Sequence, residues 1–514
     1  MPYDDLEIAW KPMPGALPAL HAVVTPAQLV ALCRRVRADS GRLVSLWGED
    51  GQDSGGALLL CVVLEAAAQL LVVEQVLLPI SPVYPDLSEI FPSAARLQRA
   101  TNDLLGMRAL GADDRPWLRH MAWPANCFPL RVGPVSPLLA PAAAEPYRFV
   151  RVEGDGVHEI AVGPVHAGTI EPGHFRFSVV GEKVLRLEAR LGYVHKGIEK
   201  RFEGMALADG SRLAARVSGD SAVAFAWAYC MAAEAATATR VPARALALRA
   251  LLLERERLAN HLGDLGAIGN DAGLAFGLAQ FSRLKEDLLR VNERVWAARY
   301  PMDAVVPGGV HDDLSADAPR LLLESMAKLE SEVRVLRDIY DNHAGLQDRF
   351  MGAGRVTPEL AQHLGIVGLG ARASGQAQDW RATFRIAPYD DVEVTPIVRA
   401  QGDVAARVAV RFDEVFETLR LCRELLASLP QGSIREPLGA VRADALAIGA
   451  VEGWRGPVLV GLRVAADGRL LRCHPHDPSW HNWPALEYAI IDNIVPDFPL
   501  INKSFNLSYS GHDL

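Results

Sequence analysis

Paired thiols are the first thing that this sequence lacks. Its six cysteines stand singly, and the nearest two, Cys33 and Cys61, are 28 positions apart. Without a C-x-x-C pair, the sequence offers neither a zinc knuckle nor an iron–sulfur cluster motif. Scattered cysteines without an export signal are typical of buried free thiols, which is what we expect here.

A basic face and a nucleotide-binding loop are also missing. Lys and Arg number 53 against 62 Asp and Glu, so the formal charge is -9. A protein that neutralises nucleic-acid phosphates needs the opposite balance, and we therefore expect no nucleic-acid partner. No G-x-G-x-x-G follows a predicted strand and no G-x-x-x-x-G-K-[ST] occurs, which argues against a nucleotide site.

Long hydrophobic runs are absent too. The most apolar run, Ala57–Leu64, spans 8 residues before Glu65 interrupts it, whereas a membrane span needs roughly 18–20. The N-terminus is acidic at Asp4 and Asp5 and does not have the basic start of a signal peptide. We expect no leader and no membrane span in a chain whose 514 residues allow two or more domains.

Residues 1–135 are predicted to form a small α+β domain. Thr25-Pro26-Ala27-Gln28 is a capping box with proline at the first helical position, and it predicts a helix to about Ala38. Three strand-like runs and a second helix follow, at Arg42–Trp47, Ala57–Glu65, Leu70–Leu78 and Ser93–Leu105. Gly106 is expected to end that second helix.

A Pro- and Ala-rich linker at 136–146 is expected to lead into a larger domain at 147–514. Short strands are predicted at its start, at Phe149–Val152, Val157–Val162 and Phe175–Val180. Five amphipathic stretches then predict a central helix bundle, at Ala222–Thr239, Ala243–Gly266, Phe276–Tyr300, Ala318–Asn342 and Val404–Leu429. A hairpin is predicted at Pro457–His474. The fold class is therefore α+β.

Two distant stretches each carry a pair of small residues three positions apart. The pairs are Ser218 with Ser221 and Ser508 with Gly511. Thiols at this spacing would suit a four-thiolate metal site, but a hydroxyl is neither soft nor ionised near pH 7, and glycine offers no ligand. From the residues alone, an alternative is that Ser218 and Asp220 cap a helix that starts near Ser221.

Three other clusters have ordinary explanations. The histidine-rich stretch His474–His481 is interpreted as a solvated or hydrogen-bonded loop rather than a metal site. An ion pair between Arg372 and Asp379 would explain those residues as well as anion binding would. Glu171, which follows the glycine loop that contains His166, is interpreted as a surface residue.

Longer motifs resemble known subunits. Gly163-Pro164-Val165-His166 and Leu191–Lys200 resemble the opening of the 49-kDa quinone-site subunit of respiratory complex I and of the related large subunits of membrane-bound nickel–iron hydrogenases. Leu258–Leu262 and Arg372–Gly375 match as well. Phe91–Ala95 resembles the 30-kDa complex I subunit, although that family's central Glu-Arg-Glu is here Gln-Arg-Ala at 98–100. The two subunits fused in this order are the build of formate-hydrogenlyase-type (group 4) hydrogenase large subunits.

The departures from the family pattern concern the site itself. The hydrogenase pattern R-x-C-G-x-C aligns with Arg216–Ser221, and N-P-C-x-x-C aligns with Asn506–Gly511. The resemblance therefore makes four positions vestigial metal-ligand positions: Ser218, Ser221, Ser508 and Gly511. The quinone-contacting His and Tyr of complex I align with Ile170 and Gly219. The sequence also ends soon after the second motif, so we expect no tail that is cleaved after metal insertion.

The pattern that remains is similar to the large subunits of energy-converting hydrogenase-related complexes. This resemblance implies a peripheral-arm subunit without a nickel–iron site, in a membrane-bound complex I-like assembly that couples electron transfer to proton or sodium movement. It implies that the chain is not itself a hydrogenase. Two alternatives stay open, namely an oxidoreductase that reduces quinone or another acceptor in the vestigial cavity, and a purely structural scaffold.

The same resemblance implies the partners and the site. We expect no cofactor on this chain, a four-iron four-sulfur cluster in a small partner subunit, a membrane anchor, antiporter-like subunits, and a place on the cytoplasmic side of the inner or plasma membrane. The candidate cavity residues are His166, Glu171, Arg216, Ser218, Asp220, Ser221, Arg372, Ser508 and Asp513.

Overall fold

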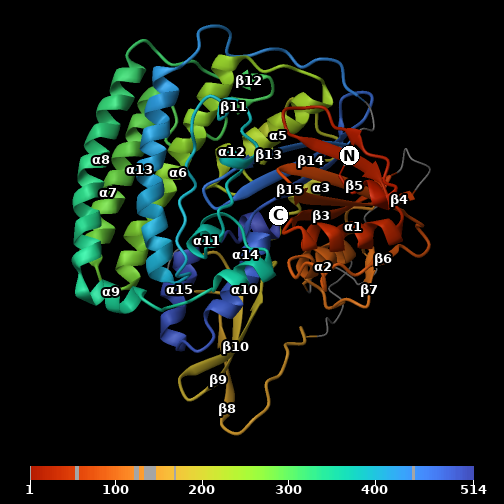
Figure 1. Ribbon diagram of the computed structural model, residues 1–514, viewed down its shortest axis with the longest axis horizontal. Coiled ribbons are helices and arrows are strands. Elements are labelled where there is room, and N and C mark those ends of the chain that lie inside the picture. Colours follow the sequence, from red (N-terminus) through yellow and green to blue (C-terminus); the bar gives the residue numbers. More distant parts are fainter. Residues whose placement is uncertain (1, 52–56, 121–126, 132–145, 167–169, 443–445) are drawn as a thin grey trace.

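The computed structural model describes residues 2–51, 57–120, 127–131, 146–166, 170–442 and 446–514. Figure 1 shows a mixed sheet and its helices on one side, a group of long helices on the other, and the C-terminal strands between them. Of the predicted linker at 136–146, only Pro146 falls within the described residues.

The N-terminal domain is a five-stranded mixed sheet in the order β1-β2-β5-β4-β3. The bounds of these strands are β1 Lys11–Pro12, β2 Ala19–Val23, β3 Arg42–Gly51, β4 Ala57–Ala66 and β5 Gln69–Leu77. Strand β2 runs parallel to β5, while the β3–β4 and β4–β5 pairs are antiparallel. The interior of β4 is buried from Leu58 to Leu64, as expected for a strand covered on both faces.

Both helices predicted in this domain are confirmed. Helix α1 (Pro26–Ala38) begins with the capping box, in which the Gln28 N–H donates to Thr25 Oγ1 at 3.3 Å and the Thr25 N–H donates to Gln28 Oε1 at 3.0 Å. Helix α2 (Ala94–Leu105) ends at Gly106, whose φ of 69° is the left-handed conformation that glycine adopts freely. A short parallel pair, β6 (Val83–Pro85) and β7 (Arg108–Leu110), flanks α2.

The larger domain opens with an antiparallel sheet of β8 (Val157–Val162), β9 (His174–Val180) and β10 (Lys183–Arg190). The strand predicted at Phe149–Val152 is wrong, because this segment joins no ladder. Its Val150 N–H donates instead to the carboxylate of Glu188 at 2.9 Å. Alternating hydrophobicity therefore misled the prediction at a segment that a side chain, not a neighbouring strand, holds in place.

Four of the five predicted long helices form the bundle. They are α6 (Ala243–Asp271), α7 (Ala275–Trp296), α8 (Ala318–Asn342) and α13 (Val404–Ala427). The fifth, α5 (Ala222–Ala236), packs on the sheet of β13 and β14 instead. All of its residues are buried, and a Cβ on Gly449 of β13 would lie 2.0 Å from the Ala228 carbonyl oxygen. An alanine-rich helix and a strand glycine allow this close approach of the two backbones.

The C-terminal part forms the antiparallel sheet β13 (Leu446–Glu452), β14 (Pro457–Val464) and β15 (Leu470–His476). The predicted hairpin is therefore confirmed, whereas the predicted loop at His474–His481 is wrong. The sheet continues to His476, and α14 (Ser479–Ala489) starts three residues later. Pro475 is tolerated because β15 is an edge strand. Helices α15 (Phe498–Phe505) and α16 (Ser510–Asp513) complete this part.

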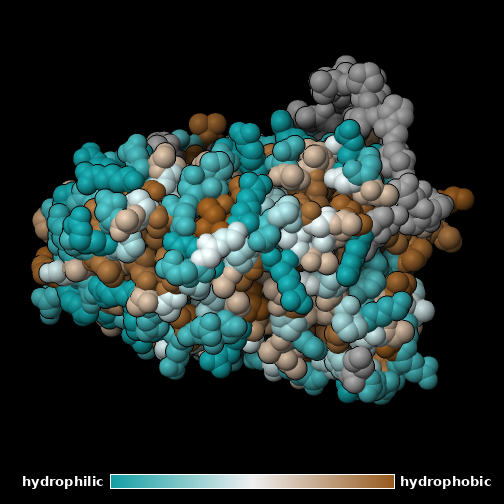
Figure 2. All heavy atoms as spheres, turned by 90° about the horizontal axis from the view of Figure 1, so that it is seen from above, coloured by the Kyte–Doolittle hydropathy of each residue, from teal (hydrophilic) through white to brown (hydrophobic). Residues whose placement is uncertain are grey.

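Shorter elements connect the main ones: η1 Asp4–Leu6, α3 Ile198–Phe202, α4 Gly210–Ala214, β11 Val305–Val306, β12 Gly309–Val310, α9 Ala344–Phe350, α10 Pro358–Leu364, α11 Gly368–Ala373, α12 Trp380–Thr383 and η3 Val495–Asp497. Among the described residues, no helix is both long and apolar enough to cross a membrane. The face seen in Figure 2 carries hydrophilic side chains over the helical end, with hydrophobic ones interspersed.

Candidate functional site

The structure brings together the two stretches that align with the hydrogenase motifs. Ser218, in the turn before α5, lies with its Oγ 2.9 Å from Oγ of Ser508, in the turn before α16. The Ser508 N–H donates to Ser479 Oγ at 2.9 Å, and the Trp483 indole donates to the Ser508 carbonyl at 3.2 Å, so α14 fixes this turn. The two serines are 2% and 4% exposed, which makes this a built, interior arrangement.

An arginine from a third segment closes the site. Nη1 of Arg455 lies 2.7 Å from Asp220 Oδ1 and 3.4 Å from Ser221 Oγ, and Nη2 contacts Asp220 Oδ2. Asp220 also accepts the Ser218 hydroxyl at 2.8 Å. Burial alone would raise the pKa of Asp220, but the Arg455 guanidinium outweighs it and holds that pKa below its usual range. The hydroxyls therefore surround an ion pair.

A buried carboxyl takes the space beside Gly511, the fourth of the positions that align with metal ligands. A Cβ on Gly511 would lie 2.3 Å from Asp477 Oδ2 and 2.9 Å from Ser508 Oγ. Asp477 is 0% exposed, and its Oδ1 accepts the Ser479 N–H at 2.8 Å. Its Oδ2 has no hydrogen-bond partner among the described residues. Burial raises the pKa of Asp477. Glycine at position 511 is what leaves room for this carboxyl.

The N-terminus of α5 is capped by a side chain of another helix. Ser218 and Asp220 do not cap α5, because the N-cap residue is Ser221 and its side chain makes no capping bond. Instead, Glu256 of α6 accepts the N–H groups of Val223 at 2.7 Å and Ala224 at 3.2 Å. Burial raises the pKa of Glu256 to about 8, although these two hydrogen bonds favour its charged form. The capping alternative for Ser218 and Asp220 is therefore wrong.

The other residues of the predicted cavity do not all lie together. Glu171 accepts the N–H of Ser510, the first residue of α16, at 3.2 Å, and Asp513, the last residue of α16, accepts the Val194 N–H at 3.1 Å. His166 Nε2 lies 2.8 Å from the Gly173 carbonyl. Arg216 is exposed and forms a bidentate pair with Asp303 at 2.7 and 2.9 Å. The structure does not bring Arg216 to the serine cluster, which is the group formed by Ser218, Ser221 and Ser508.

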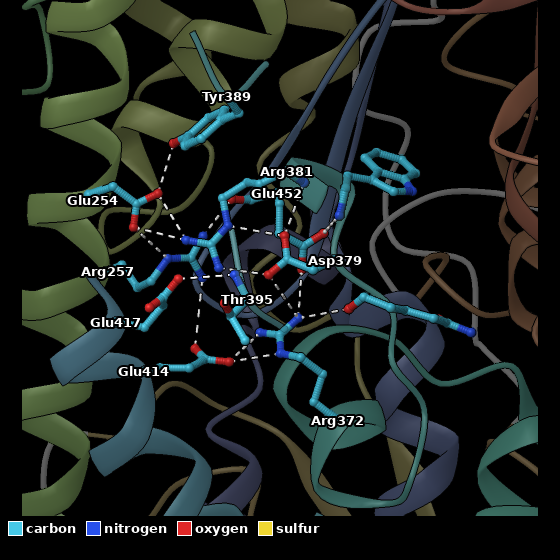
Figure 3. Close-up of polar contacts among 12 residues, drawn as sticks. Glu254, Arg257, Arg372, Asp379, Arg381, Tyr389, Thr395, Glu414, Glu417 and Glu452 are labelled. Carbon is cyan, nitrogen blue, oxygen red and sulfur yellow. Dashed lines mark hydrogen bonds and ion pairs between the residues drawn. The ribbon is translucent and has the colours of Figure 1, made fainter. Parts of the chain in front are cut away.

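Arg372 lies in a separate buried network, shown in Figure 3. Its Nε donates to Glu414 at 2.7 Å, and its Nη1 lies 3.0 Å from Glu452 and 3.9 Å from Asp379. The ion-pair interpretation of Arg372 and Asp379 is thus confirmed. Arg381 bridges Asp379 at 2.6 Å and Glu254 at 2.9 Å.

The network holds more carboxyls than guanidiniums. Four acids, Glu254, Asp379, Glu414 and Glu452, face three arginines at 257, 372 and 381. Burial, with the nearby Asp379 charge, raises the pKa of Glu452 to about 7. The fourth acid can therefore carry a proton near neutral pH, which balances the charges.

A four-residue segment joins this network to the serine cluster. Glu452 ends β13 inside the network, and Arg455, three positions on, pairs with Asp220. Between them, the Trp454 indole donates to the Asp220 carbonyl at 2.8 Å, and the Trp454 ring lies edge-on to His261 at 6.2 Å. The same short segment thus carries side chains that belong to both groups.

The histidine-rich stretch lies at the contact between the two domains. Ser45 Oγ of β3 lies 3.0 Å from His474 Nε2 and 3.1 Å from His476 Nδ1. The Trp47 ring stacks on His474 at 4.7 Å, and His481 Nε2 lies 2.9 Å from the Val44 carbonyl. These histidines are hydrogen-bonded, as one form of the interpretation has it, but they are not solvated, because the N-terminal domain covers them.

One further group of side chains has metal-ligand spacing. Ligand atoms of Glu49, Cys61 and Glu74 lie within 4.8 Å of one another. Arg463 contacts both carboxylates, so a cation already occupies the space between them. Burial raises the pKa of the Cys61 thiol, which disfavours the thiolate that binds metals. This cluster is a buried ion-pair network.

Sequence comparison gives two family matches in the order found here. Residues 22–133 match the respiratory-chain NADH dehydrogenase 30-kDa subunit, and residues 271–445 match its 49-kDa subunit. Formate hydrogenlyase subunit 5 of Escherichia coli is 32% identical over 84% of this chain and 77% of its own length. Hydrogenase-4 component G of the same species is 29% identical over 92% and 84% of the two chains.

Structure comparison agrees in fold. A chain of the membrane-bound sulfane sulfur reductase, described as an archaeal respiratory membrane complex, superposes with a TM-score of 0.65 at 24% identity, over 70% of this chain and 99% of that one. The predicted fold class, an α+β chain with a 30-kDa-like domain before a 49-kDa-like domain, is confirmed. The chain belongs to the family of fused 30-kDa and 49-kDa complex I-type subunits that includes formate hydrogenlyase subunit 5.

Proposed function

We propose that this chain is a peripheral-arm subunit of a membrane-bound, complex I-like redox assembly in which the nickel–iron position holds no metal. The observation that carries the proposal is the set of donors at that position. It comprises three serine hydroxyls, a glycine, the Asp220–Arg455 ion pair and the Asp477 carboxyl. A nickel–iron centre needs soft thiolate ligands, whereas a hydroxyl is neither soft nor ionised near pH 7 and glycine offers no ligand.

The residues present therefore do not fit a nickel–iron centre. A ligand side chain at position 511 would overlap Asp477, and thiolates at 218 and 221 would face the polar ends of a hydrogen-bonded ion pair. Hydrogen chemistry accordingly needs both new ligands and displacement of the Asp477 carboxyl. The arrangement suits a scaffold that keeps the shape of the site and replaces its metal by internal polar contacts.

The assembly proposal rests on the relatives. Formate hydrogenlyase, hydrogenase-4, NADH-quinone oxidoreductase and the sulfane sulfur reductase are multisubunit by name or description. By analogy, the partners of this chain are a small subunit with a four-iron four-sulfur cluster, a membrane anchor and antiporter-like subunits, on the cytoplasmic side of the membrane. Electron transfer through the partner would then be coupled to proton or sodium movement.

A second candidate function is reduction of an acceptor at the same position. One observation favours it, because the Asp220 side chain is 37% exposed and a Cβ on Gly219 would meet only Met302 Cε, at 3.9 Å. A small quinone-like molecule could approach the ion pair from this open side. A purely structural scaffold, without coupling or turnover, is the third candidate.

Purification of the complex from membranes separates these functions. The proposal predicts co-purification of an iron–sulfur subunit with an electron paramagnetic resonance signal, and no hydrogen–deuterium exchange activity. Ion uptake by vesicles on reduction of that cluster supports coupling, and its absence supports the scaffold. Acceptor-dependent reoxidation of the cluster, lost in Asp220→Ala but kept in Arg216→Ala, favours the acceptor site. Arg216 is a matched control because it faces Asp303.

A further inference from the structure

A cavity between α6, α7 and α8 lies apart from the sites described so far. Its volume is about 260 Å³, which at about 30 Å³ per water-sized group gives room for about nine such groups. Its floor is apolar and buried, and it is formed by Leu284, Leu288, Met326 and Leu329. An apolar floor of this kind gains from covering by a hydrocarbon group.

A buried guanidinium without a carboxylate partner also lines this cavity. Arg255 is 1% exposed. Its Nε donates to Asn292 Oδ1 at 2.5 Å, its Nη2 donates to the Leu288 carbonyl at 3.2 Å, and its Cζ lies 5.7 Å from the Trp296 ring centre. No carboxylate of the described chain lies within 4.0 Å of it. These neutral groups solvate the charge of Arg255 but do not neutralise it.

The contrast with other buried arginines makes Arg255 unusual. A carboxylate lies within 4.0 Å of each member of a larger set: Arg249, Arg257, Arg372, Arg381, Arg411, Arg455 and Arg472. Arg190 and Arg407 have none either. Arg190 donates to the Trp117 and Arg119 carbonyls, and three nitrogens of Arg407 donate at 2.7–2.9 Å, but neither arginine lines this cavity. Burial lowers the pKa of Arg255 to about 10. A buried cation in this state is costly unless an anion joins it.

The rim adds positive charge to that of Arg255. Arg290, Arg294 and Lys328 line the cavity with two acids, Asp287 and Glu332, so four cations face two anions. Arg283 pairs with both acids, and Lys328 lies 3.8 Å from Asp287 and 4.0 Å from Glu332. Arg290 pairs with Glu286, which is not part of the lining. This local excess of two positive charges stands on a chain whose net charge is -9. The field at the cavity therefore favours an anion.

We propose that this cavity binds a small organic carboxylate with a hydrocarbon tail. The carboxylate pairs with the Arg255 guanidinium, and the tail packs on the leucines and methionine between α7 and α8. A guanidinium matches a carboxylate in shape and neutralises its charge without water. An inorganic anion would leave the apolar floor bare, and a neutral apolar molecule would leave Arg255 unpaired. This site is independent of the serine cluster and of the assembly proposed above.

Calorimetric titration of the full-length chain tests the proposal, with octanoate as the probe. Acetate has the charge without the tail, and octan-1-ol has the tail without the charge. Octanoate should bind saturably, and Arg255→Met should weaken it by about tenfold or more. Arg320→Met, which removes an exposed arginine of α8, should leave binding unchanged. Ser325→Phe, which keeps the charge but fills the cavity, should also abolish binding.

Three results would overturn the proposal. They are no saturable octanoate binding at millimolar concentration, equal affinity of wild type and Arg255→Met, and octan-1-ol or acetate binding as tightly as octanoate. Thermal unfolding separates loss of the site from loss of the fold. Arg255→Met should unfold at the temperature of the wild type or above, because it removes an uncompensated buried charge.

Discussion

Substitution of Gly511 by alanine probes the space that Asp477 takes in the serine cluster. The new Cβ would lie 2.3 Å from Asp477 Oδ2, about 1 Å inside ordinary contact. Asp477 cannot easily move, because its Oδ1 holds the Ser479 N–H at the start of α14. Overpacking of this kind costs about 1–3 kcal/mol, and the lower entropy of the unfolded alanine chain returns about 0.4–1 kcal/mol. Gly511→Ala should therefore destabilise the protein by about 1–2 kcal/mol.

Urea unfolding of four proteins measures this effect as a cycle. In Asp477→Ala the carboxyl is gone, and Ser508 Oγ, at 2.9 Å, stays within close contact of the new Cβ. The cost of alanine at 511 should therefore fall, with a coupling of about 1–3 kcal/mol between the two sites. Gly219→Ala is the matched control, since its Cβ would meet only Met302 Cε at 3.9 Å and its stability should change by less than about 0.5 kcal/mol. Equal costs of Gly511→Ala in the two backgrounds would refute the packing of Asp477 into this space.

Three further predictions concern the surroundings of the site. Burial raises the pKa of Glu256 to about 8, above the roughly 4.3 of an unfolded chain, so the folded protein holds an extra proton between these values. Wild type should lose thermal stability relative to Glu256→Gln as pH rises from about 4.5 to 8, and a gap that does not change with pH would contradict this. Arg372→Met should lower the free energy of unfolding in urea by about 3–5 kcal/mol, because it leaves buried carboxylates without a partner. The control Arg320→Met, at an exposed arginine, should change it by less than about 0.5 kcal/mol. Similar costs for both variants would argue against the network. Ser45→Ala should cost about 1–3 kcal/mol, since the hydroxyl bridges two buried histidines across the domain contact, and a cost near zero would mean that the histidines find other partners.

Local patterns in the sequence predicted most of the regular structure. The prediction for α8 has the bounds of the structure, Ala318–Asn342, because a periodic apolar stripe and proline at the start of the helix agree. The capping box of α1 was readable for the same reason, as both of its hydrogen bonds join residues three positions apart. The sequence did not predict where α5 packs, because an alanine-rich helix has no polar face to show which neighbour it contacts.

The contents of the site depend on contacts that no local pattern encodes. Arg455 pairs with Asp220 across 235 positions, and Asp477 meets Gly511 only after α14 and α16 have packed together. The resemblance of the Ser218–Ser221 stretch to a metal-ligand motif suggested where a site should be, but it did not show that an ion pair lies there. Glu256 illustrates the same limit. It caps α5 from another helix, α6, whereas the local pattern suggested Ser218 and Asp220 as the capping residues.

Nickel content of the complex purified from membranes tests the central claim most directly. The cells should be grown with nickel supplied, and a nickel–iron hydrogenase prepared in parallel should serve as the positive control. The account predicts nickel far below one atom per chain, both in the wild type and in a variant with cysteine at Ser218, Ser221 and Ser508, because position 511 still offers no ligand and Asp477 still takes the space beside it. One nickel per wild-type chain would contradict it.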